Sequence, residues 1–185
     1  MANKGLTIIY IGEGKGKTTA AMGLGLRAVG TGLDVGVLQF VKGEWPTGEK
    51  DFAQVFQEMK VPKNKMLGRF EFVTAGRGFV KILGDKKPLS VHKKAAALGL
   101  KQARQMFKKF DVVILDELLS AYESKLIKLS DVEKIISAKP KDVHLVITGH
   151  YLPAKLKIKA DLITEMKMIK HPFYKGILAQ KGVDY

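Results

Sequence analysis

The fold of this chain is decided by the stretch Gly12-Glu13-Gly14-Lys15-Gly16-Lys17-Thr18-Thr19. It follows the apolar run at residues 6–11 and precedes a segment rich in alanine and leucine, so it indicates a strand, a glycine loop and the start of a helix. Glycines let the backbone turn so that several N–H groups point at one anion. The helix N-terminus adds partial positive charge, Lys17 can reach the outer phosphates, and the Thr18 hydroxyl can ligate Mg²⁺. The stretch therefore predicts a nucleotide triphosphate site.

The loop is one residue shorter than the usual phosphate-binding pattern. That pattern places four residues between its first glycine and the Gly-Lys pair, whereas three residues separate Gly12 from Gly16 here. The alternative interpretation is a glycine-rich turn capped by Thr18. The strand before the loop and the helix after it favour phosphate binding.

The bulk properties fit one domain over residues 1–185. The chain is 46% hydrophobic and 27% charged, which is typical of a globular protein and not of a disordered one. It has no cysteine, so disulfides and thiolate metal sites are excluded, and a reducing compartment suits it. No signal peptide precedes the first strand, and no apolar run approaches the roughly 20 residues that span a membrane. We therefore expect a cytoplasmic protein.

The net charge of +14 has two interpretations. A lysine-rich surface can bind polyanions such as nucleic acid or nucleotide triphosphates, or it can simply keep the protein in solution. The lysines are spread from Lys42 to Lys181 without an arginine-rich block, and few aromatic residues are interleaved with them. This pattern favours a solvated or weakly anion-attracting surface over a nucleic-acid groove.

Segments typical of strands and of helices alternate along the chain. Strands are expected at residues 6–11, 35–40, 70–73, 112–115, 144–148 and 162–166, and the first two are expected to be buried. Helices are expected at residues 18–30, 51–59, 90–109 and 130–140, with a short one from residue 153. Ser90 is expected to cap one helix and Ser130 with Glu133 to form a capping box, while residues 170–185 are expected to be extended. The alternation predicts a three-layer α/β fold of the recombinase-like P-loop NTPase kind, with a mainly parallel β-sheet.

In a parallel sheet, ligands bind beyond the carboxyl ends of the strands. That rule brings five loops to one edge, at residues 12–18, 39–49, 74–79, 116–117 and 148–150. Asp116 and Glu117 follow four apolar residues and supply carboxylates for Mg²⁺ beside the Thr18 hydroxyl. The spacing leaves open which of the two acids contacts the ion.

Aromatic and histidine residues of these loops are further candidates. Trp45, the sole tryptophan, and Phe79 either cover a planar ligand or anchor their loops onto the domain. The four histidines show no metal-binding spacing, and His150 and His171 are better candidates for a ligand contact than His144. No pairing of a serine or cysteine with a histidine indicates a nucleophilic site.

These residues resemble those of the P-loop ATP:corrinoid adenosyltransferases, also called cob(I)alamin adenosyltransferases. The resemblance starts in the shortened loop at residues 12–21, and its blocks keep the same order along nearly the whole chain. The other blocks are residues 27–30, 36–43, 45–49, 76–79, 115–118, 147–149, 160–161, 170–173 and 182–185. The shortened loop is what this family is expected to show.

The resemblance implies a transferase that moves the 5′-deoxyadenosyl group of ATP onto the reduced cobalt of a corrinoid such as cobalamin. Cobalt(I) attacks the ribose C5′ and triphosphate leaves, with ATP bound so that C5′ faces the attack. The protein supplies placement and the cobalt supplies the nucleophile. The resemblance thus implies ATP, Mg²⁺ and a corrinoid as the ligands, and a role in cobalamin biosynthesis or salvage.

The resemblance also assigns roles to single residues. Lys17 neutralises the charge of the departing triphosphate, and Thr18 and Glu117 ligate Mg²⁺ with Asp116 close behind. Phe79 packs on the corrinoid and helps displace its lower axial ligand, which eases formation of cobalt(I) because a d⁸ ion prefers no axial donor. The phosphates are held by Gly12, Glu13, Gly14, Lys15, Gly16, Lys17, Thr18 and Thr19. Contacts with ATP or the corrinoid are expected from Arg27, Trp45, Phe79 and His171.

The chain departs from the family pattern at four places. Lys81 stands where a tryptophan is frequent, Glu13 where a small polar residue is frequent, and His150 in place of an arginine. The chain also starts at the first strand, without the N-terminal extension of some members. These departures are expected to alter the affinity for the corrinoid and the segments that cover the site. They are expected to alter ATP binding less.

Two other functions fit parts of the sequence. A recombinase-like ATPase that binds nucleic acid would use the same fold and the charge of +14, but the sequence offers it no obvious groove of basic and aromatic residues. A small-molecule kinase would need a base aimed at an acceptor hydroxyl, and none is identifiable. The family resemblance suggests a homodimer that works with an electron-donating reductase, without nucleic acid or a membrane.

Overall fold

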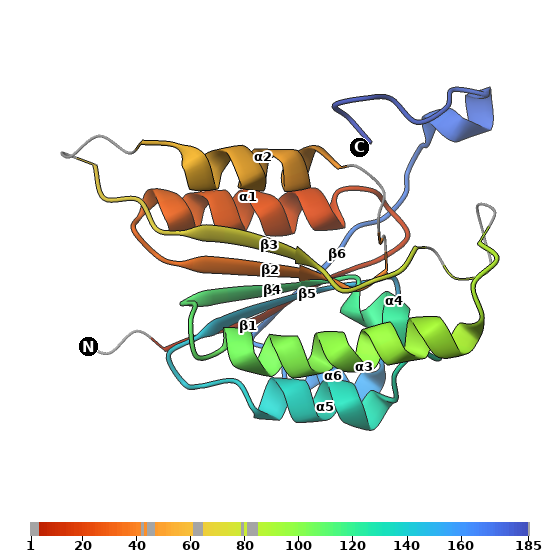
Figure 1. Ribbon diagram of the computed structural model, residues 1–185. Coiled ribbons are helices and arrows are strands. Elements are labelled where there is room, and N and C mark those ends of the chain that lie inside the picture. The colour runs from red at the N-terminus through yellow and green to blue at the C-terminus, as the bar shows by residue number, and fades with distance from the viewer. Residues whose placement is uncertain are drawn as a thin grey trace.

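The protein is built around a six-stranded sheet (Figure 1). The computed structural model describes residues 4–41, 43, 47–60, 65–78, 80 and 85–184. The strand order is β3-β2-β4-β5-β1-β6, and each neighbouring pair of these strands runs parallel. The strands are β1 (Thr7–Ile11), β2 (Val35–Gln39), β3 (Phe70–Thr74), β4 (Val112–Asp116), β5 (His144–Thr148) and β6 (Leu162–Glu165). The predicted parallel sheet is confirmed.

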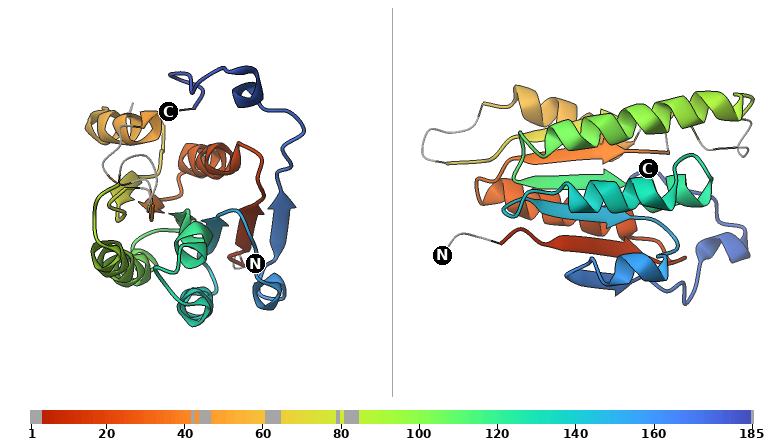
Figure 2. Two further views of the ribbon diagram at one scale, coloured as in Figure 1. Left: turned by 90° about the vertical axis from the view of Figure 1, so that its right-hand side faces the viewer. Right: turned by 90° about the horizontal axis from the view of Figure 1, so that it is seen from below.

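Helices cover both faces of the sheet (Figure 1, Figure 2). One face carries α1 (Lys17–Gly30) and α2 (Gly48–Glu58). The other face carries α3 (Leu89–Met106), α4 (Leu118–Glu123), α5 (Leu129–Ser137) and α6 (Ala154–Lys157). A 3₁₀ helix, η1 (Pro172–Lys175), lies in the segment after β6. This arrangement confirms the predicted three-layer α/β architecture. Within the described ranges, no helix is long and apolar enough to cross a membrane.

The central strands are buried on both faces. Every residue of β2 and of β4 is buried, because helices cover the sheet on either side and the apolar runs gain free energy by leaving water. On the α1 face, a Cβ added at Gly25 would lie 3.1 Å from the Cδ1 atom of Ile114. The glycine therefore lets α1 lie close to β4, which places the start of α1 beside the strand ends.

The strand register aligns polar residues at the carboxyl ends of three neighbouring strands. Gln39 at the end of β2 pairs with Asp116 at the end of β4. Leu115 pairs with Ile147 in β5, so Thr148 lies one step further along, beside Asp116. Because side chains in register on adjacent strands point to the same face, these three polar groups meet at one edge of the sheet.

The capping predictions for two helices were wrong. α3 begins at Leu89 after Pro88, so Ser90 lies inside the first turn and does not cap it. α5 begins at Leu129, and the Asp131 carboxylate accepts a hydrogen bond from the backbone N–H of Lys128 at 2.9 Å. Asp131 is three residues after Lys128, one helical turn, which is the position from which an acid reaches back to the cap.

Two segments hold more helix than the sequence predicted. α4 begins directly after Glu117, and its six residues are too few to give a periodic apolar signal. η1 interrupts the segment 170–185 that was expected to be extended. It begins at Pro172, whose fixed φ suits a first helical position, and the Nδ1 atom of His171 accepts from the backbone N–H of Phe173 at 3.1 Å.

An ion pair ties the turn before β2 to the residue before β3. The Oδ2 atom of Asp34 accepts from Arg69 Nη2 at 2.7 Å and from Arg69 Nε at 3.0 Å, and Oδ1 accepts from the backbone N–H of Arg69 at 2.7 Å. The side-chain hydrogen bonds from Arg69 hold the pKa of Asp34 below its ordinary value of 3.8. The folded state therefore favours the ionised carboxylate more than the unfolded chain does.

Asp34→Asn is expected to lower the free energy of unfolding by about 1 kcal/mol at neutral pH, since the pair is partly exposed. A carboxylate with a lowered pKa stabilises the fold above its unfolded pKa, and this contribution is lost as the pH falls through the folded pKa. The gap between wild type and variant should thus be constant above about pH 5 and close below about pH 4. Urea unfolding over this pH range measures it, with the exposed Asp142→Asn as control. A difference in the free energy of unfolding between wild type and Asp34→Asn that persists below about pH 4 would contradict a stabilising role of the ionised Asp34 carboxylate.

Candidate functional site

The phosphate-binding loop between β1 and α1 turns through two glycines in the left-handed region. Gly12 has a φ of 112° and Gly16 a φ of 107°, conformations that strain other residues. Gly16 is the N-cap of α1 and gives the helix no side-chain hydrogen bond. The first N–H groups of α1 are therefore left for another acceptor, which is how helix N-termini bind phosphate.

Backbone contacts on two sides brace the loop. The N–H of Gly12 donates to the His150 carbonyl at 2.9 Å, and the N–H of Gly14 donates to the Met166 carbonyl at 2.8 Å. A Cβ added at Gly12 would lie 2.3 Å from the same Met166 oxygen, so a side chain does not fit there. Because the amides of Gly12 and Gly14 donate to carbonyls of the protein, these two amides are not available to a phosphate.

Lys17 carries its positive charge into the loop. Its side chain is buried, and its ammonium donates to the carbonyls of Gly12 at 2.7 Å and Gly14 at 2.8 Å. The charge therefore lies next to the first amides of α1. Both features attract an anion to the same place.

Asp116 joins four elements of the fold. It is fully buried at the end of β4. Its Oδ1 atom accepts from the Thr18 hydroxyl at 2.9 Å and from the Thr148 hydroxyl at 2.8 Å, and its Oδ2 atom accepts from the Gln39 amide at 2.9 Å. A buried carboxylate must be hydrogen-bonded, and here the donors come from α1, β5 and β2. The structure brings Thr18 and Asp116 together, as the sequence predicted.

Glu117 holds a left-handed backbone at the turn from β4 into α4. Its φ is 60°, an uncommon value for a residue other than glycine. Its N–H donates to the Thr148 hydroxyl at 2.8 Å, and its carboxylate accepts a hydrogen bond from the Ser120 hydroxyl. Such a conformation costs on the order of 1–3 kcal/mol and is frequent at functional sites.

A polar pocket of about 430 Å³ opens beside these groups. It is formed by the phosphate loop, the starts of α1 and α2, the first residue after β4 and the turn near the C-terminus. The lining residues are Lys15, Gly16, Lys17, Thr18, Thr19, Gly48, Glu49, Glu117, Gly182, Val183 and Asp184. Two lysines, the first turn of α1 and three acids, Glu49, Glu117 and Asp184, thus border one space. Asp184 is paired with Lys15. Basic groups, helix amides and carboxylates side by side are the groups that a triphosphate with a bound cation requires.

The hydroxyl of Thr18 and the carboxylate of Glu117 are oxygen ligands of the kind that Mg²⁺ prefers. The described residues contain no group of three or more His, Cys, Asp or Glu side chains that could hold a metal ion. Mg²⁺ does not require one, because it usually takes one or two carboxylates and completes its shell with phosphate and water. The donor set of the pocket therefore fits this ion.

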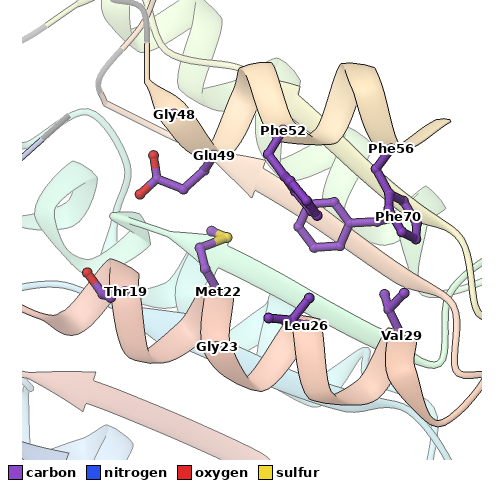
Figure 3. A pocket seen from close by; sticks show the side chains of 10 residues that line it. All are labelled: Thr19, Met22, Gly23, Leu26, Val29, Gly48, Glu49, Phe52, Phe56 and Phe70. Atoms are coloured by element: carbon purple, nitrogen blue, oxygen red, sulfur yellow. The ribbon is translucent and has the colours of Figure 1, made fainter. Parts of the chain in front are cut away.

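An apolar pocket of about 390 Å³ continues from the polar one between α1 and α2 (Figure 3). The two pockets share Thr19, Gly48 and Glu49. The rest of the apolar lining is Met22, Gly23, Leu26, Val29, Phe52, Phe56 and Phe70. Phe52 stacks on Phe56 with 5.6 Å between ring centroids and meets Phe70 edge-on at 6.2 Å. Such a wall suits a flat, weakly polar group.

Two predicted site residues lie away from the pockets. Arg27 is exposed in the last turn of α1, about 15 Å along the helix axis from Lys17. The structure therefore does not bring Arg27 to the phosphate loop. His171 caps η1 and lines neither the polar nor the apolar pocket.

The unusual acid of the loop, Glu13, is exposed and lines neither pocket. Its charge is therefore solvated, which explains how an acid is tolerated in a phosphate-binding loop. Trp45 and Phe79 lie outside the described residues, as does Lys81.

Sequence reasoning assigned no role to several polar residues at this edge. Gln39 and Thr148 orient Asp116, and each of them ends an apolar strand, which was the available signal. Ser120 bonds Glu117 from a helix that the sequence did not predict. Asp184 forms an ion pair with Lys15, and both residues line the polar pocket. The block at residues 182–185 resembled the family, but no role was assigned to Asp184.

Residues 3–185 match the family described as ATP:corrinoid adenosyltransferase BtuR/CobO/CobP. The chain is 36% identical to a corrinoid adenosyltransferase of Pseudomonas aeruginosa, over 98% of this chain and 84% of the relative. It is 34% identical to the corrinoid adenosyltransferase CobA of Salmonella typhimurium, over 98% of this chain and 86% of the relative. Among solved structures, the replication initiator DnaA bound to AMPPCP and single-stranded DNA has a TM-score of 0.43 at 14% identity, over 91% of this chain and 41% of that one.

Removal of the Asp116 carboxylate is expected to destabilise the fold. Asp116→Ala leaves three donors, of which Gln39 and Thr148 are buried, without their acceptor, so we expect the free energy of unfolding to fall by about 2–4 kcal/mol. Asp116→Asn should cost less, because the Gln39 amide can turn and accept from the new amide group. Urea unfolding measures both variants, and the exposed Asp142→Ala should change stability by less than about 0.5 kcal/mol. Equal losses for alanine and asparagine would show that the donor network does not account for the stability.

Proposed function

Because this chain belongs to the family of ATP:corrinoid adenosyltransferases, we propose that it transfers the 5′-deoxyadenosyl group of ATP to the cobalt of a reduced corrinoid. The cobalt(I) electron pair forms a bond to C5′, the bond between C5′ and the triphosphate oxygen breaks, and triphosphate leaves with that electron pair. The observation that carries the proposal is the pocket that joins the phosphate loop to Glu117. The protein places ATP, and the cobalt of the substrate supplies the nucleophile.

The polar pocket supports binding of the triphosphate. Lys15 and Lys17 bring two positive charges to it, and the start of α1 adds backbone amides. We assign residues 15–19 to the phosphates, with Gly12 and Gly14 shaping the loop. Lys17 then offsets the negative charge of the departing triphosphate, which lowers the barrier to its release.

We propose that the same pocket holds Mg²⁺. The Thr18 hydroxyl and the Glu117 carboxylate would hold the ion, and Asp116 would orient Thr18 through the 2.9 Å hydrogen bond. When bound, Mg²⁺ neutralises phosphate charge and so makes the triphosphate a better leaving group.

The apolar pocket is our proposed place for the adenosine end of ATP. It begins where the polar pocket ends, at Thr19, Gly48 and Glu49. The Phe52 ring offers a face of the size that a purine base can cover. A nucleotide whose triphosphate lies in the loop can therefore bury its base between α1 and α2.

For the corrinoid, we propose a place at the carboxyl edge of the sheet and, from the family resemblance, contacts with Phe79 and Trp45. The support is a contact between the loops that carry these two residues. A Cβ added at Gly43 would lie 2.1 Å from the backbone nitrogen of Gly78, so the loops after β2 and β3 touch each other. Two touching loops can together cover a large planar substrate.

We also propose that residues 1–185 act as one domain of a cytoplasmic homodimer that receives electrons from a reductase. The absence of cysteine is compatible with a reducing compartment, which protects cobalt(I). Large exposed apolar side chains after β6, including Ile169, Tyr174 and Leu178, support an interface with a second copy.

Lys17→Ala is expected to slow formation of the cobalt–carbon bond by at least about 100-fold, because the charge that faces the triphosphate is lost. Absorbance spectra of reduced cobalamin, Mg-ATP and protein under anaerobic conditions measure the new bond. Lys101→Ala, on the exposed side of α3, is the control and should react as the wild type does. Orthophosphate release without a cobalt–carbon bond in the wild type, or full activity in Lys17→Ala, would refute the proposal.

Phe52→Ala is expected to raise the Kd of ATP about five- to tenfold, because a stacking surface for the base is lost. Inorganic triphosphate, used as a competitor, should bind as before, since it has no base. Val55→Ala is the matched control, because Val55 lies on the same helix but does not line the pocket. Equal weakening of ATP and inorganic triphosphate would place the base elsewhere.

A further inference from the structure

The turn formed by residues 180–184 is one wall of the polar pocket. Gly182, Val183 and Asp184 line this pocket together with the phosphate loop and Glu117. The turn closes on itself, because the Asp184 N–H donates to the Gln180 carbonyl at 2.8 Å and the Gln180 N–H donates to Asp184 Oδ2 at 2.7 Å. Figure 1 shows the segment after β6 folding back, so that the C-terminus lies near the first turns of α1 and α2.

An ion pair links this turn to the phosphate loop. The second oxygen of the carboxylate, Asp184 Oδ1, contacts the Lys15 ammonium. The Asp184 side chain is only 12% exposed, whereas residues 176–183 are all exposed and none of them belongs to the buried core. The carboxylate is thus oriented on one side by its own turn and on the other by the phosphate loop.

The turn does not plug the pocket. With the turn in place, the pocket still measures about 430 Å³, and Gly16, Lys17 and Thr18 still line it. An ammonium has three N–H donors, so Lys15 can keep its contact with Asp184 while it donates to a phosphate oxygen. Asp184 therefore holds the Lys15 ammonium and leaves it able to bind a phosphate oxygen.

We propose that Asp184 is a positioning residue for ATP. It holds the Lys15 ammonium at the pocket and, through the same ion pair, holds residues 180–184 as a wall. The inference rests on the proposed function in that ATP is the ligand. Without the carboxylate, the long Lys15 side chain and the turn both gain freedom that nucleotide binding must then remove. Repulsion between Asp184 and the triphosphate acts in the opposite direction, but the paired ammonium offsets it.

The first test is the Kd of Mg-ATP, measured by calorimetry without corrinoid. Asp184→Asn keeps the shape and removes the charge, and we expect the Kd to rise about five- to tenfold. Asp184→Glu keeps the ion pair and should stay within about threefold of the wild type. Asp142→Asn, an exposed acid that lines neither pocket, should leave the Kd unchanged. A Kd for Asp184→Asn at or below that of the wild type would overturn the inference, and a lower one would show that the turn competes with the nucleotide.

A double-mutant cycle shows whether Asp184 acts through Lys15. Lys15→Met should weaken Mg-ATP binding, and adding Asp184→Asn to it should change the Kd no further. If Asp184→Asn raises the Kd as much in the Lys15→Met variant as in the wild type, the carboxylate acts independently of Lys15. That result would contradict the proposed role.

Limited proteolysis tests whether the ion pair holds residues 180–184 in place. Asp184→Asn should speed tryptic cleavage after Lys181, with an unchanged melting temperature because the turn packs on no core residue. An unchanged rate of cleavage would show that Asp184 does not hold the turn in place. These readouts need no corrinoid, so a protein that passes them but forms no cobalt–carbon bond contradicts only the proposed function. If the wild type binds no Mg-ATP, both proposals are wrong.

Discussion

The buried carboxylate of Asp116 must find hydrogen-bond donors, and this constraint ties the site together. Thr18, Thr148 and Gln39 supply them, and each comes from a different element of the fold. The register of β2 and β4 and the position of the first turn of α1 are therefore coupled at one point. Because Thr18 also lines the polar pocket, the interaction that stabilises the sheet edge also fixes one wall of the pocket in which we propose that the triphosphate binds.

The phosphate loop is held by a second constraint. Its backbone contacts two segments that are distant in the sequence, at His150 and Met166. His150 and Met166 accept from the loop amides, and the absence of a side chain at Gly12 lets the segment after β6 lie against the loop. A short loop held in this way has little freedom to rearrange. The amides of α1 and the ammonium groups of Lys15 and Lys17 are thus organised before any ligand arrives, which reduces the cost of binding.

Much of the fold was predictable because its signals are local. Apolar runs mark the strands of a sheet that is covered on both faces, and the glycine loop and Asp116 each follow such a run. The errors have local causes too: α4 is too short to show periodicity, and Pro88 moved the start of α3 ahead of Ser90. Arg27 had a role by family resemblance only, and its place at the far end of α1 follows from helix geometry.

The sequence by itself determined the layered α/β fold, the phosphate loop and the acid that faces it, because each is encoded in a few consecutive residues. It also indicated the family, through blocks that keep their order along the chain. Only the tertiary structure decided that Gln39 and Thr148 orient Asp116, that Glu13 faces solvent, and that Asp184 reaches Lys15. These contacts join segments far apart in the chain, or depend on which way a loop residue faces, and neither spacing nor composition carries that information.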